Sequence, residues 1–391
     1  MKSATSLPNS GRDLKHRWWA TLPARDLVLL PLLSLSTIAV MFSFAEMASR
    51  HFWPDPQFDT CVIWEGPIGP HMQPNCVSYE RVPESPSIRN VYNACGYRSL
   101  AACGPKPAGT IRIAVLGSSA AEALLVPMDE TYAELAARHL QDLCHCSVEV
   151  QEIAAPLSSP YNSLERVDEA LRLQPDAVLF MLTPMDLEAL LYEGADAKKW
   201  ARSVKGGGVG ANTGIYKRLQ IALLSSRTAL VLEHYFFQNP DVYARFYLLY
   251  GDKADFLRQP FTRAWEQRFQ DLDYITGRMA ARLNAAGVPL FVAAAPSRAD
   301  ASLMASSKRS RAIDPYAWGD RIRGIAAAHR AHYVDLLRAF GETPHSDSFC
   351  FVVDGHLNAD AQPLISRALV HALLAADIPA FSSCRAKNRS S

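Results

Sequence analysis

The sequence predicts an α/β protein: a three-layer, doubly wound parallel sheet with helices on both faces, carrying a helical insertion and preceded by one N-terminal transmembrane helix. From Ile111 onward, short continuous apolar runs alternate with helical patterns, which is typical of parallel strands buried on both faces. The 391 residues are 49% hydrophobic and 20% charged, as in ordinary globular domains. The net charge of +1 argues against nucleic acid as a partner, because nucleic-acid binders normally carry a basic stripe.

The N-terminal segment predicts a membrane anchor over residues 27–46. Leu27 to Ala45 is a run of 19 uncharged residues, long enough to cross a bilayer core at about 1.5 Å per residue. Basic residues outnumber acidic ones in residues 1–26, so the positive-inside rule places that segment in the cytoplasm and the remaining chain outside it. A cleaved signal peptide is the alternative, since Ser43-Phe-Ala45 is a tolerable cleavage site. The apolar run exceeds a usual signal-peptide core, which favours an uncleaved anchor in the lipid bilayer.

All eight cysteines follow the anchor, and their even number favours disulfides in an oxidising compartment. Proximity suggests that Cys61 pairs with Cys76 and Cys95 with Cys103, although spacing alone does not fix connectivity. A zinc site is the alternative, but the spacings match no familiar ligand pattern. We therefore expect no metal site.

Composition divides the chain after the anchor into three parts. Residues 47–110 are rich in Pro, Gly, Asn and Cys, which predicts an irregular, cystine-containing lead-in. Residues 111–378 carry the regular α/β pattern, and residues 379–391 have the composition of a polar tail.

Periodicity gives the elements of the α/β domain in order. We predict five strands: Ile111–Leu116, Val148–Ile153, Ala177–Leu182, Val288–Ala295 and Ala331–Leu336; the first, third and fourth are nearly continuous apolar runs. Longer periodic stretches predict helices: Thr131–Leu143, Ser163–Leu173, Ala264–Ala286, Tyr316–His329 and about Asp360–Ala376.

Residues 195–260, approximately, interrupt this alternation. The aromatic-rich stretch Leu232–Tyr250 predicts a helical insertion whose aromatic side chains serve in packing. The glycine-rich loop at 206–210 lacks the Lys-Ser/Thr ending of a phosphate-binding loop.

The segment Ile111–Glu122 has the layout of a strand-to-helix elbow. Its apolar run stops at Gly117, meets Ser118 and Ser119, and passes at once into helix-forming residues. A serine on such an elbow can project its hydroxyl over the carboxyl end of a sheet, where an enzyme can hold a nucleophile. These residues taken alone favour a structural interpretation, because Ser119-Ala-Ala-Glu122 is also a capping box that begins a helix.

A base for this serine occurs late in the chain, in Asp354-Gly-His356. A nucleophilic serine needs an imidazole to take its proton, and the imidazole needs a carboxylate that fixes its tautomer. One loop can bring both groups to the sheet edge. The structural interpretation is that Asp-Gly makes a turn and that Asn358 or Asp360 caps the final helix.

Over roughly Ile111 to Ala376 the chain resembles the SGNH/GDSL hydrolase superfamily. Four segments follow in the family's order and spacing: Ile111–Glu122, Val148–Ser159, Gln174–Asp186 and Asp354–Asn358. The resemblance implies a flavodoxin-like sheet, with Ser119 as nucleophile, His356 as base and Asp354 as its carboxylate. Asp-x-His is the spacing of some branches; at the carboxylate position of the commoner Asp-x-x-His this chain has Val353.

The chain departs from the family pattern at three positions. The residue before the nucleophile is Ser118 instead of Asp, the second-block Gly falls at about Ala155, and the third-block Asn falls at Met185. The last two positions normally join the nucleophile's own N–H in the oxyanion hole. A backbone N–H survives a Gly-to-Ala exchange, but the Met side chain has no hydrogen to donate. Loss of one such donor typically lowers turnover about 10²–10³-fold.

Nearby residues are candidates for oxyanion and substrate contacts. Asn162, Ser158 or Thr183 could supply a substitute donor. Asp186 keeps the family's last third-block residue, although an acidic residue after a strand is also a routine helix cap. Arg298 is a candidate for contact with an acyl or sugar substrate, or else an ordinary surface arginine.

The resemblance implies a Ser–His–Asp esterase or O-acyltransferase that needs no cofactor and acts on an acylated glycan or another ester substrate. Together with the anchor, it implies a single-pass protein of the bacterial inner membrane with its catalytic domain in the periplasm. The alternative is a catalytically inactive subunit that binds or assembles with other proteins of an envelope polysaccharide system.

Overall fold

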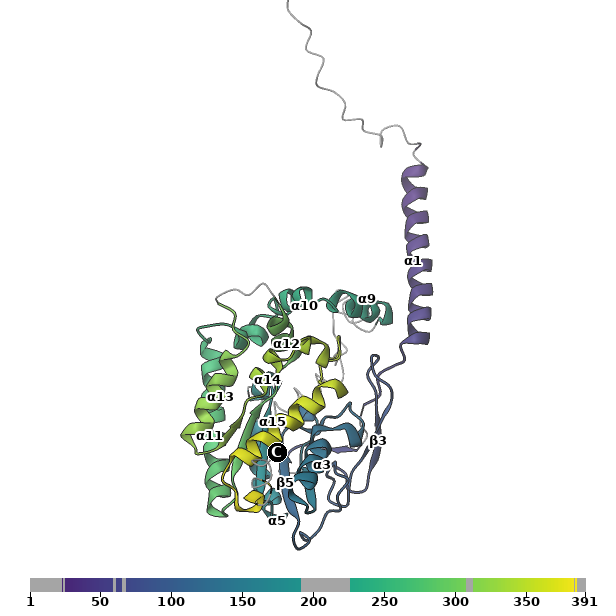
Figure 1. Ribbon diagram of the computed structural model, residues 1–391. Helices are drawn as coiled ribbons and strands as arrows, with labels where there is room; N and C mark the ends of the chain where they lie inside the picture. Colours follow the sequence, from purple (N-terminus) through teal and green to yellow (C-terminus); the bar gives the residue numbers. More distant parts are fainter. Residues whose placement is uncertain are drawn as a thin grey trace, which may run out of the picture. The chain divides into compact units, whose positions relative to one another are not determined.

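The computed structural model describes residues 23, 25–58, 61–64, 68–190, 226–306, 312–382 and 384 (Figure 1). Contacts within the chain define two units, residues 1–52 and residues 53–391. The basic residues before Pro23 lie outside the described part. The proposed boundaries at residues 46, 110 and 378 stay predictions.

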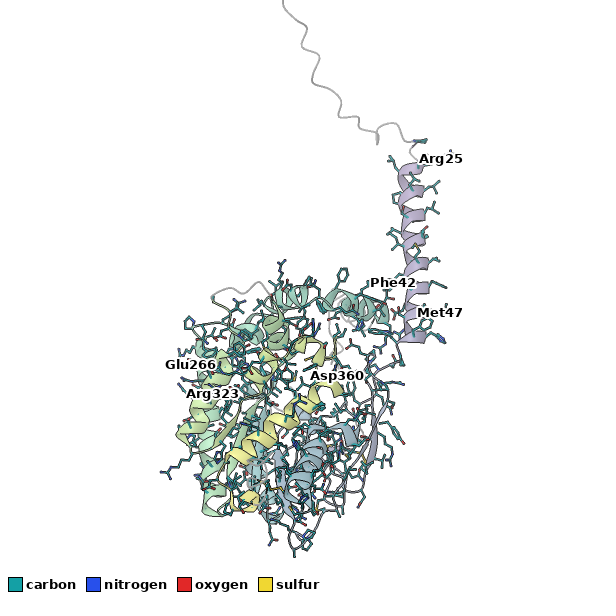
Figure 2. The ribbon with its side chains drawn as sticks, in the orientation of Figure 1. Arg25, Phe42, Met47, Glu266, Arg323 and Asp360 are labelled. Atoms are coloured by element: carbon teal, nitrogen blue, oxygen red, sulfur yellow. A yellow bond between two sulfur atoms is a disulfide. The ribbon has the colours of Figure 1, made fainter. Side chains whose placement is uncertain are left out.

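The first unit contains helix α1 (Asp26–Phe52), which includes the predicted anchor and continues beyond it. None of its residues is buried, and side chains such as Phe42 and Met47 project freely from it (Figure 2). By length and composition α1 can cross a membrane, a test that an N-terminal signal sequence also passes.

The second unit is built on the predicted parallel sheet. Its five strands are β5 (Ile111–Leu116), β6 (Val148–Glu152), β7 (Ala177–Leu182), β8 (Leu290–Ala294) and β9 (His332–Val334). All are parallel, in the order β6-β5-β7-β8-β9, so the strand order reverses at β5. The predicted fold class is confirmed, and ligands of such sheets bind where the order reverses.

Burial explains why the strands read as continuous apolar runs. Every residue of β5, β7 and β8 is buried, because helices cover both faces of the sheet. Ile113 of β5 pairs with Val150 of β6 on one side and with Ala177 of β7 on the other. These pairs place the carboxyl ends of β5, β6 and β7 at one edge of the sheet.

Helices α3 and α15 pack together on one face, and α11 packs against α4, α5 and α13 on the other (Figure 1). The helix bounds are α2 (Ser119–Glu122), α3 (Tyr132–Cys144), α4 (Pro160–Glu165), α5 (Val167–Arg172), α6 (Pro184–Ala189), α11 (Arg263–Ala285), α12 (Arg298–Ala305), α13 (Ala317–Ala328), α14 (Leu336–Glu342) and α15 (Gln362–Ala375). Short 3-10 turns occur at Met128–Glu130, Gly251–Leu257, Ser346–Phe349, Ala359–Ala361 and Pro379–Phe381.

The helix predicted at Ser163–Leu173 is two helices in the structure. Helix α4 begins earlier than predicted, at Pro160, because Ser159 and Asn162 form a capping box. Arg166 separates α4 from α5, and its buried guanidinium donates to the carbonyl of Ile153 and to Glu169. The pattern of apolar residues does not show these polar contacts of Arg166, so it did not predict the break between the two helices.

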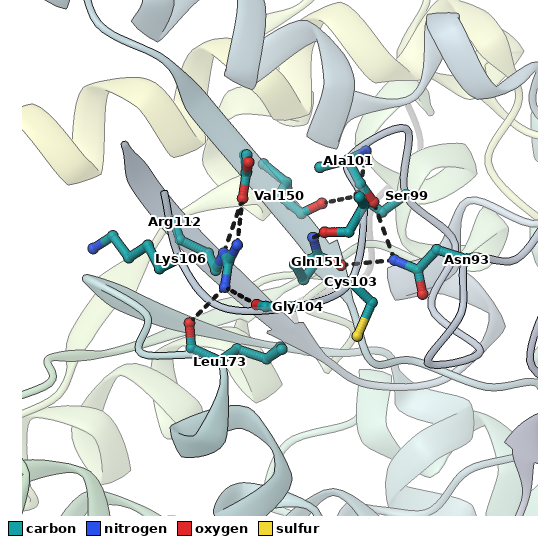
Figure 3. A network of polar contacts seen from close by, with 12 residues as sticks. Asn93, Ser99, Ala101, Cys103, Gly104, Lys106, Arg112, Val150, Gln151 and Leu173 are labelled. Atoms are coloured by element: carbon teal, nitrogen blue, oxygen red, sulfur yellow. Dashed lines mark hydrogen bonds and ion pairs between the residues drawn. The ribbon is translucent and has the colours of Figure 1, made fainter. Parts of the chain in front are cut away.

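The lead-in contains two small antiparallel sheets: β1 (Val62–Ile63) with β2 (His71–Met72), and β3 (Val77–Glu80) with β4 (Ile88–Val91). Disulfides Cys61–Cys76 and Cys95–Cys103 confirm both predicted pairings. Polar contacts join the lead-in to the sheet (Figure 3). The Ser99 hydroxyl donates to the carbonyl of Val150 at 2.6 Å, and Asn93 Nδ2 donates to Gln151 Oε1 at 3.0 Å. The lead-in is therefore bound directly to strand β6.

One further disulfide lies near the end of the chain. Cys384 is buried and forms a disulfide with Cys144 of α3. Proximity did not suggest this pair, because 240 residues separate its members. Cys146 and Cys350 are free thiols.

The insertion contains helices α9 (Arg227–Phe237) and α10 (Pro240–Tyr247), as the aromatic-rich stretch predicts. Its rings pack against one another; Phe237 and Tyr243, for example, meet edge to face with 5.3 Å between centroids. Residues 191–225, with the glycine-rich loop at 206–210, lie outside the described residues.

Candidate active site

The elbow forms where β5 ends and helix α2 begins. Gly117 connects them in a tight approach to β7, since a Cβ there would lie 2.8 Å from the carbonyl oxygen of Met181. Ser118 takes the N-cap position and Ser119 is the first helical residue. The predicted Ser119–Glu122 capping box is not formed, because Ser118 is the N-cap and makes no side-chain capping bond, while Glu122 Oε1 accepts the Tyr92 hydroxyl at 2.7 Å. The Ser119 side chain is thus free of the capping role.

Ser119, His356 and Asp354 lie in a continuous chain of hydrogen bonds. Ser119 Oγ is 2.9 Å from His356 Nε2, and His356 Nδ1 is 2.6 Å from Asp354 Oδ1. The backbone N–H of His356 also donates to Asp354 Oδ1, at 3.1 Å. The loop between the 3-10 turns Ser346–Phe349 and Ala359–Ala361 therefore brings both groups to a serine 237 residues from His356. This is the geometry in which an imidazole accepts a serine proton while a carboxylate fixes its tautomer.

Neighbouring charges tune this pair. Burial favours the neutral imidazole, but the charge and hydrogen bond of Asp354, with the charges of Asp186 and Glu122, raise the pKa of His356 above its usual value. Burial also opposes ionisation of Asp354, whereas the charge of His356 and its two hydrogen bonds hold the pKa of Asp354 below its usual value. Neutral His356 is consequently a stronger base than an isolated histidine.

Arg98 of the lead-in stabilises the elbow by hydrogen bonds to the end of α2. Its fully buried guanidinium donates to the carbonyl of Ala123 at 3.2 Å and to that of Val126 at 2.6 Å, and also to that of Glu122. These carbonyls lie at and just beyond the end of α2, where helix geometry leaves oxygens without intrahelical partners. Sequence analysis missed Arg98, because nothing in the local pattern marks a buried arginine.

The backbone donors proposed for the oxyanion hole are engaged elsewhere. Ala155 is fully buried, and its N–H donates to the Gly117 carbonyl at 3.4 Å, so its role in the oxyanion hole stays a prediction. Ser158 N–H donates to the Ala155 carbonyl at 3.1 Å. Thr183 donates both its N–H and its hydroxyl to Asp186 Oδ2, at 2.6 and 2.8 Å.

Two side chains belong to the expected oxyanion side of the site, Met185 and Asn162. Met185, in the first turn of α6, is 53% exposed and brings no donor. Asn162 uses its carbonyl oxygen to accept from the N–H and hydroxyl of Ser159. Its amide nitrogen lies against Gly69, where a Cβ would come within 2.2 Å. The structure records no contact of Asn162 with Ser119.

Asp186 connects the third block to the elbow. It is buried at the N-terminus of α6, and burial raises the pKa of its carboxyl despite hydrogen bonds from Ser118 and Thr183. Ser118 stands where the family has Asp. Its side-chain hydrogen bond to Asp186 links the elbow to the third block. Asp186 acts on the site through its charge on His356.

Arg298 requires a correction. It is buried at the start of α12, donates to the carbonyl of Phe237 and stacks over Tyr243, with 3.7 Å from guanidinium carbon to ring centroid. Arg298 therefore fastens the insertion to α12 and is not an ordinary surface arginine, while its contact with a substrate stays a prediction. Within the described ranges, no group of three or more His, Cys, Asp or Glu side chains is placed to hold a metal ion.

Comparison with known proteins gives structural likeness only. No family model matches the sequence, and no curated protein sequence matches it. A protein named TesA is 13% identical over 67% of this chain and 97% of its own, with a TM-score of 0.38. The psychrotrophic esterase EstA from a Pseudoalteromonas species is 13% identical over 67% and 96%, with a TM-score of 0.35. A lipase/acylhydrolase from Enterococcus faecalis is 12% identical over 67% and 94%, with a TM-score of 0.33.

The sheet order and the placement of Ser119, Asp354 and His356 rest on this chain's own geometry. In fold and in the order of its motifs, the chain resembles the SGNH/GDSL hydrolase superfamily.

Proposed function

We propose that this protein cleaves or transfers ester-linked acyl groups by a Ser–His–Asp mechanism. The observation that carries the proposal is the hydrogen-bonded chain from Ser119 Oγ through His356 to Asp354. A hydroxyl bonded to an imidazole that a carboxylate orients is an activated nucleophile. Its position after β5, where the strand order reverses, is where doubly wound sheets hold their ligands.

The reaction proceeds in two halves. Ser119 Oγ attacks the acyl carbonyl carbon while His356 Nε2 takes the hydroxyl proton, and Asp354 stabilises the imidazolium that forms. Collapse of the tetrahedral intermediate breaks the ester C–O bond, and His356 returns the proton to the leaving alcohol. Water or a sugar hydroxyl then attacks the acyl-enzyme, with His356 again as base, which regenerates Ser119.

The proposed setting is the periplasmic face of a bacterial inner membrane, with an acylated envelope glycan as substrate. The apolar helix α1 and the basic residues before it favour a cytoplasmic N-terminus. Three disulfides in residues 61–384 favour an oxidising compartment for the second unit. The glycan follows from this setting and from the family resemblance.

A second candidate is a non-catalytic binding or assembly subunit of an envelope polysaccharide system. Two observations favour it: the oxyanion side offers Met185 where the family has a donor, and the N–H of Ala155 is directed to Gly117. A site that moves the serine proton but stabilises little negative charge would turn over slowly.

Labelling with an alkyl fluorophosphonate tests the two candidates, using the full chain in detergent. We expect the wild type and Ser87→Ala, an exposed control, to become labelled, and Ser119→Ala to remain unlabelled. Equal labelling of Ser119→Ala would place the nucleophile elsewhere. An unlabelled wild type, together with full function of the Ser119→Ala protein in cells, would establish the non-catalytic candidate.

A further inference from the structure

The loop that carries Asp354 and His356 is held by a residue far away in the sequence. Glu84 Oε2 accepts the backbone N–H of Val353 at 2.8 Å and that of Asp354 at 3.1 Å. Glu84 belongs to the lead-in, between β3 and β4, and lies 269 residues before Val353. Two charge-assisted bonds from one carboxylate fix the backbone just before the Asp354 side chain.

The other oxygen of the same carboxylate is held by the insertion. Glu84 Oε1 lies 2.6 Å from His234 Nδ1 of helix α9, and His234 Nε2 lies 3.0 Å from Gln238 Nε2 on the next turn. The ring of Trp53 meets the His234 ring edge-on, with 4.9 Å between centroids. The His234 ring is therefore fixed from three sides.

Burial strengthens the contacts of Glu84, because water competes little with them. The Glu84 side chain is 4% exposed and the His234 side chain 23%. A small cavity of about 140 Å³ adjoins Glu84, lined mainly by apolar groups from Trp53, Phe58 and Leu230. A buried carboxylate whose oxygens all have partners defines one geometry, because leaving any partner unpaired is costly.

We propose that Glu84 is the positioning residue for the Asp354–His356 loop and that His234 connects this loop to the insertion. The inference rests on the proposed function only for its catalytic consequence. It assigns a role to the lead-in and to α9 that the Ser–His–Asp chain alone does not contain.

The consequence for catalysis follows from distances. The Asp354 oxygen must stay within hydrogen-bonding reach of His356 Nδ1, where it is now 2.6 Å away. A displacement of about 1 Å at a catalytic group can lower the rate about 10²-fold. The charged groups that act on His356 are Asp354, Asp186 and Glu122. The charged groups around Glu84 include Arg298, Glu233 and His234.

Hydrogen exchange tests the contact without any assumption about activity. In the full chain in detergent, Glu84→Ala should exchange the amide protons of Val353 and Asp354 at least about 10-fold faster than wild type. Glu84→Gln should stay close to wild type, because its amide oxygen still accepts both N–H groups. Glu342→Ala, at an exposed acid of α14, is the control. Unchanged exchange in Glu84→Ala would overturn the proposal.

Fluorophosphonate labelling of Ser119 as a function of pH tests the catalytic consequence. Glu84→Ala should label about 10²-fold more slowly. It should also reach half its maximal rate at a lower pH, because a loosened Asp354 raises the pKa of His356 less. His234→Phe should show the same shift with about a threefold loss of rate. A uniform loss at every pH, with no shift, would reduce Glu84 to a structural residue.

Two further outcomes keep the tests separate. If Glu84→Ala does not fold, Glu84→Asp, whose carboxylate is one methylene shorter, should show the same changes in smaller measure. If the wild type is never labelled, the proposed function fails, while the exchange experiment still decides the role of Glu84.

Discussion

The proton-transfer half of the candidate site is complete, whereas the half that would stabilise negative charge has few donors in place. On the proton-transfer side, Ser119, His356 and Asp354 form an unbroken chain, and Glu84 fixes its far end. On the charge-stabilising side, the Ala155 N–H is directed to Gly117 and Met185 stands exposed. An ester hydrolase needs both halves, because the proton moves only as negative charge develops on the carbonyl oxygen.

The contrast shows that a complete catalytic trio does not by itself define an efficient enzyme. Ser119 begins α2, so its own N–H has no intrahelical acceptor and can still face an oxyanion. If the proposed function holds, we expect an acyl-enzyme to form slowly at a site whose Ala155 N–H is already engaged. A slow acyl-enzyme favours acceptors that are bound and oriented, as a sugar hydroxyl would be in an acyl transferase.

The largest effect should come from breaking the proton-transfer side. His356→Ala should lower the rate of fluorophosphonate labelling about 10⁴-fold, because Ser119 then lacks a base. His371→Ala, at an exposed histidine of α15, should label like the wild type. Similar rates for His356→Ala and the control would show that the 2.9 Å contact has no chemical role.

Strengthening the charge-stabilising side should have the next largest effect. Met185→Asn returns an amide donor to the position where the family has one, and should raise p-nitrophenyl acetate turnover about 10²-fold. Met185→Leu is the matched control, since it keeps the volume and adds no donor. If the two variants behave alike, Met185 does not border the oxyanion.

Much of this arrangement could be predicted from the sequence, because its signals are local. Strands β5, β7 and β8 are buried on both faces, so the sequence shows them as nearly continuous apolar runs. The elbow and the Asp354-Gly-His356 segment were recognisable from residue type and spacing. The close pairs Cys61–Cys76 and Cys95–Cys103 followed from proximity.

The residues that were missed act over long distances. Glu84 reaches Asp354 across 270 residues, and Arg98 reaches α2 from the irregular lead-in. Arg298 was misplaced for the related reason that an arginine reads as exposed, whereas here the aromatic ring of Tyr243 covers it. Each depends on tertiary contacts that no window of sequence contains.

Arg98 is shared by both halves, because it fixes the helix that bears Ser119 and its N–H. Arg98→Met should lower the free energy of unfolding by about 3 kcal/mol, since it leaves several buried carbonyls without their donor. The folded fraction should be labelled about 10-fold more slowly. Denaturant unfolding and labelling measure these changes, with the exposed Arg89→Met as control. A destabilised variant with unchanged labelling would separate Arg98 from the elbow's geometry.

The smallest effect should come from Asp186, which influences His356 only through its charge. Its negative charge favours the imidazolium, so Asp186→Asn should lower the pKa of His356 and move the acidic limb of the labelling profile to lower pH. The side-chain oxygen of Asn can still accept the Thr183 bonds, so the maximal rate should change less than about threefold. Asp354→Asn should move the limb in the same direction but also lower the maximal rate, because Asp354 orients the ring directly. A limb that stays where it is in Asp186→Asn would mean that Asp186 is already protonated in the wild type and places no negative charge near His356, which would remove it from the proton-transfer side of the comparison.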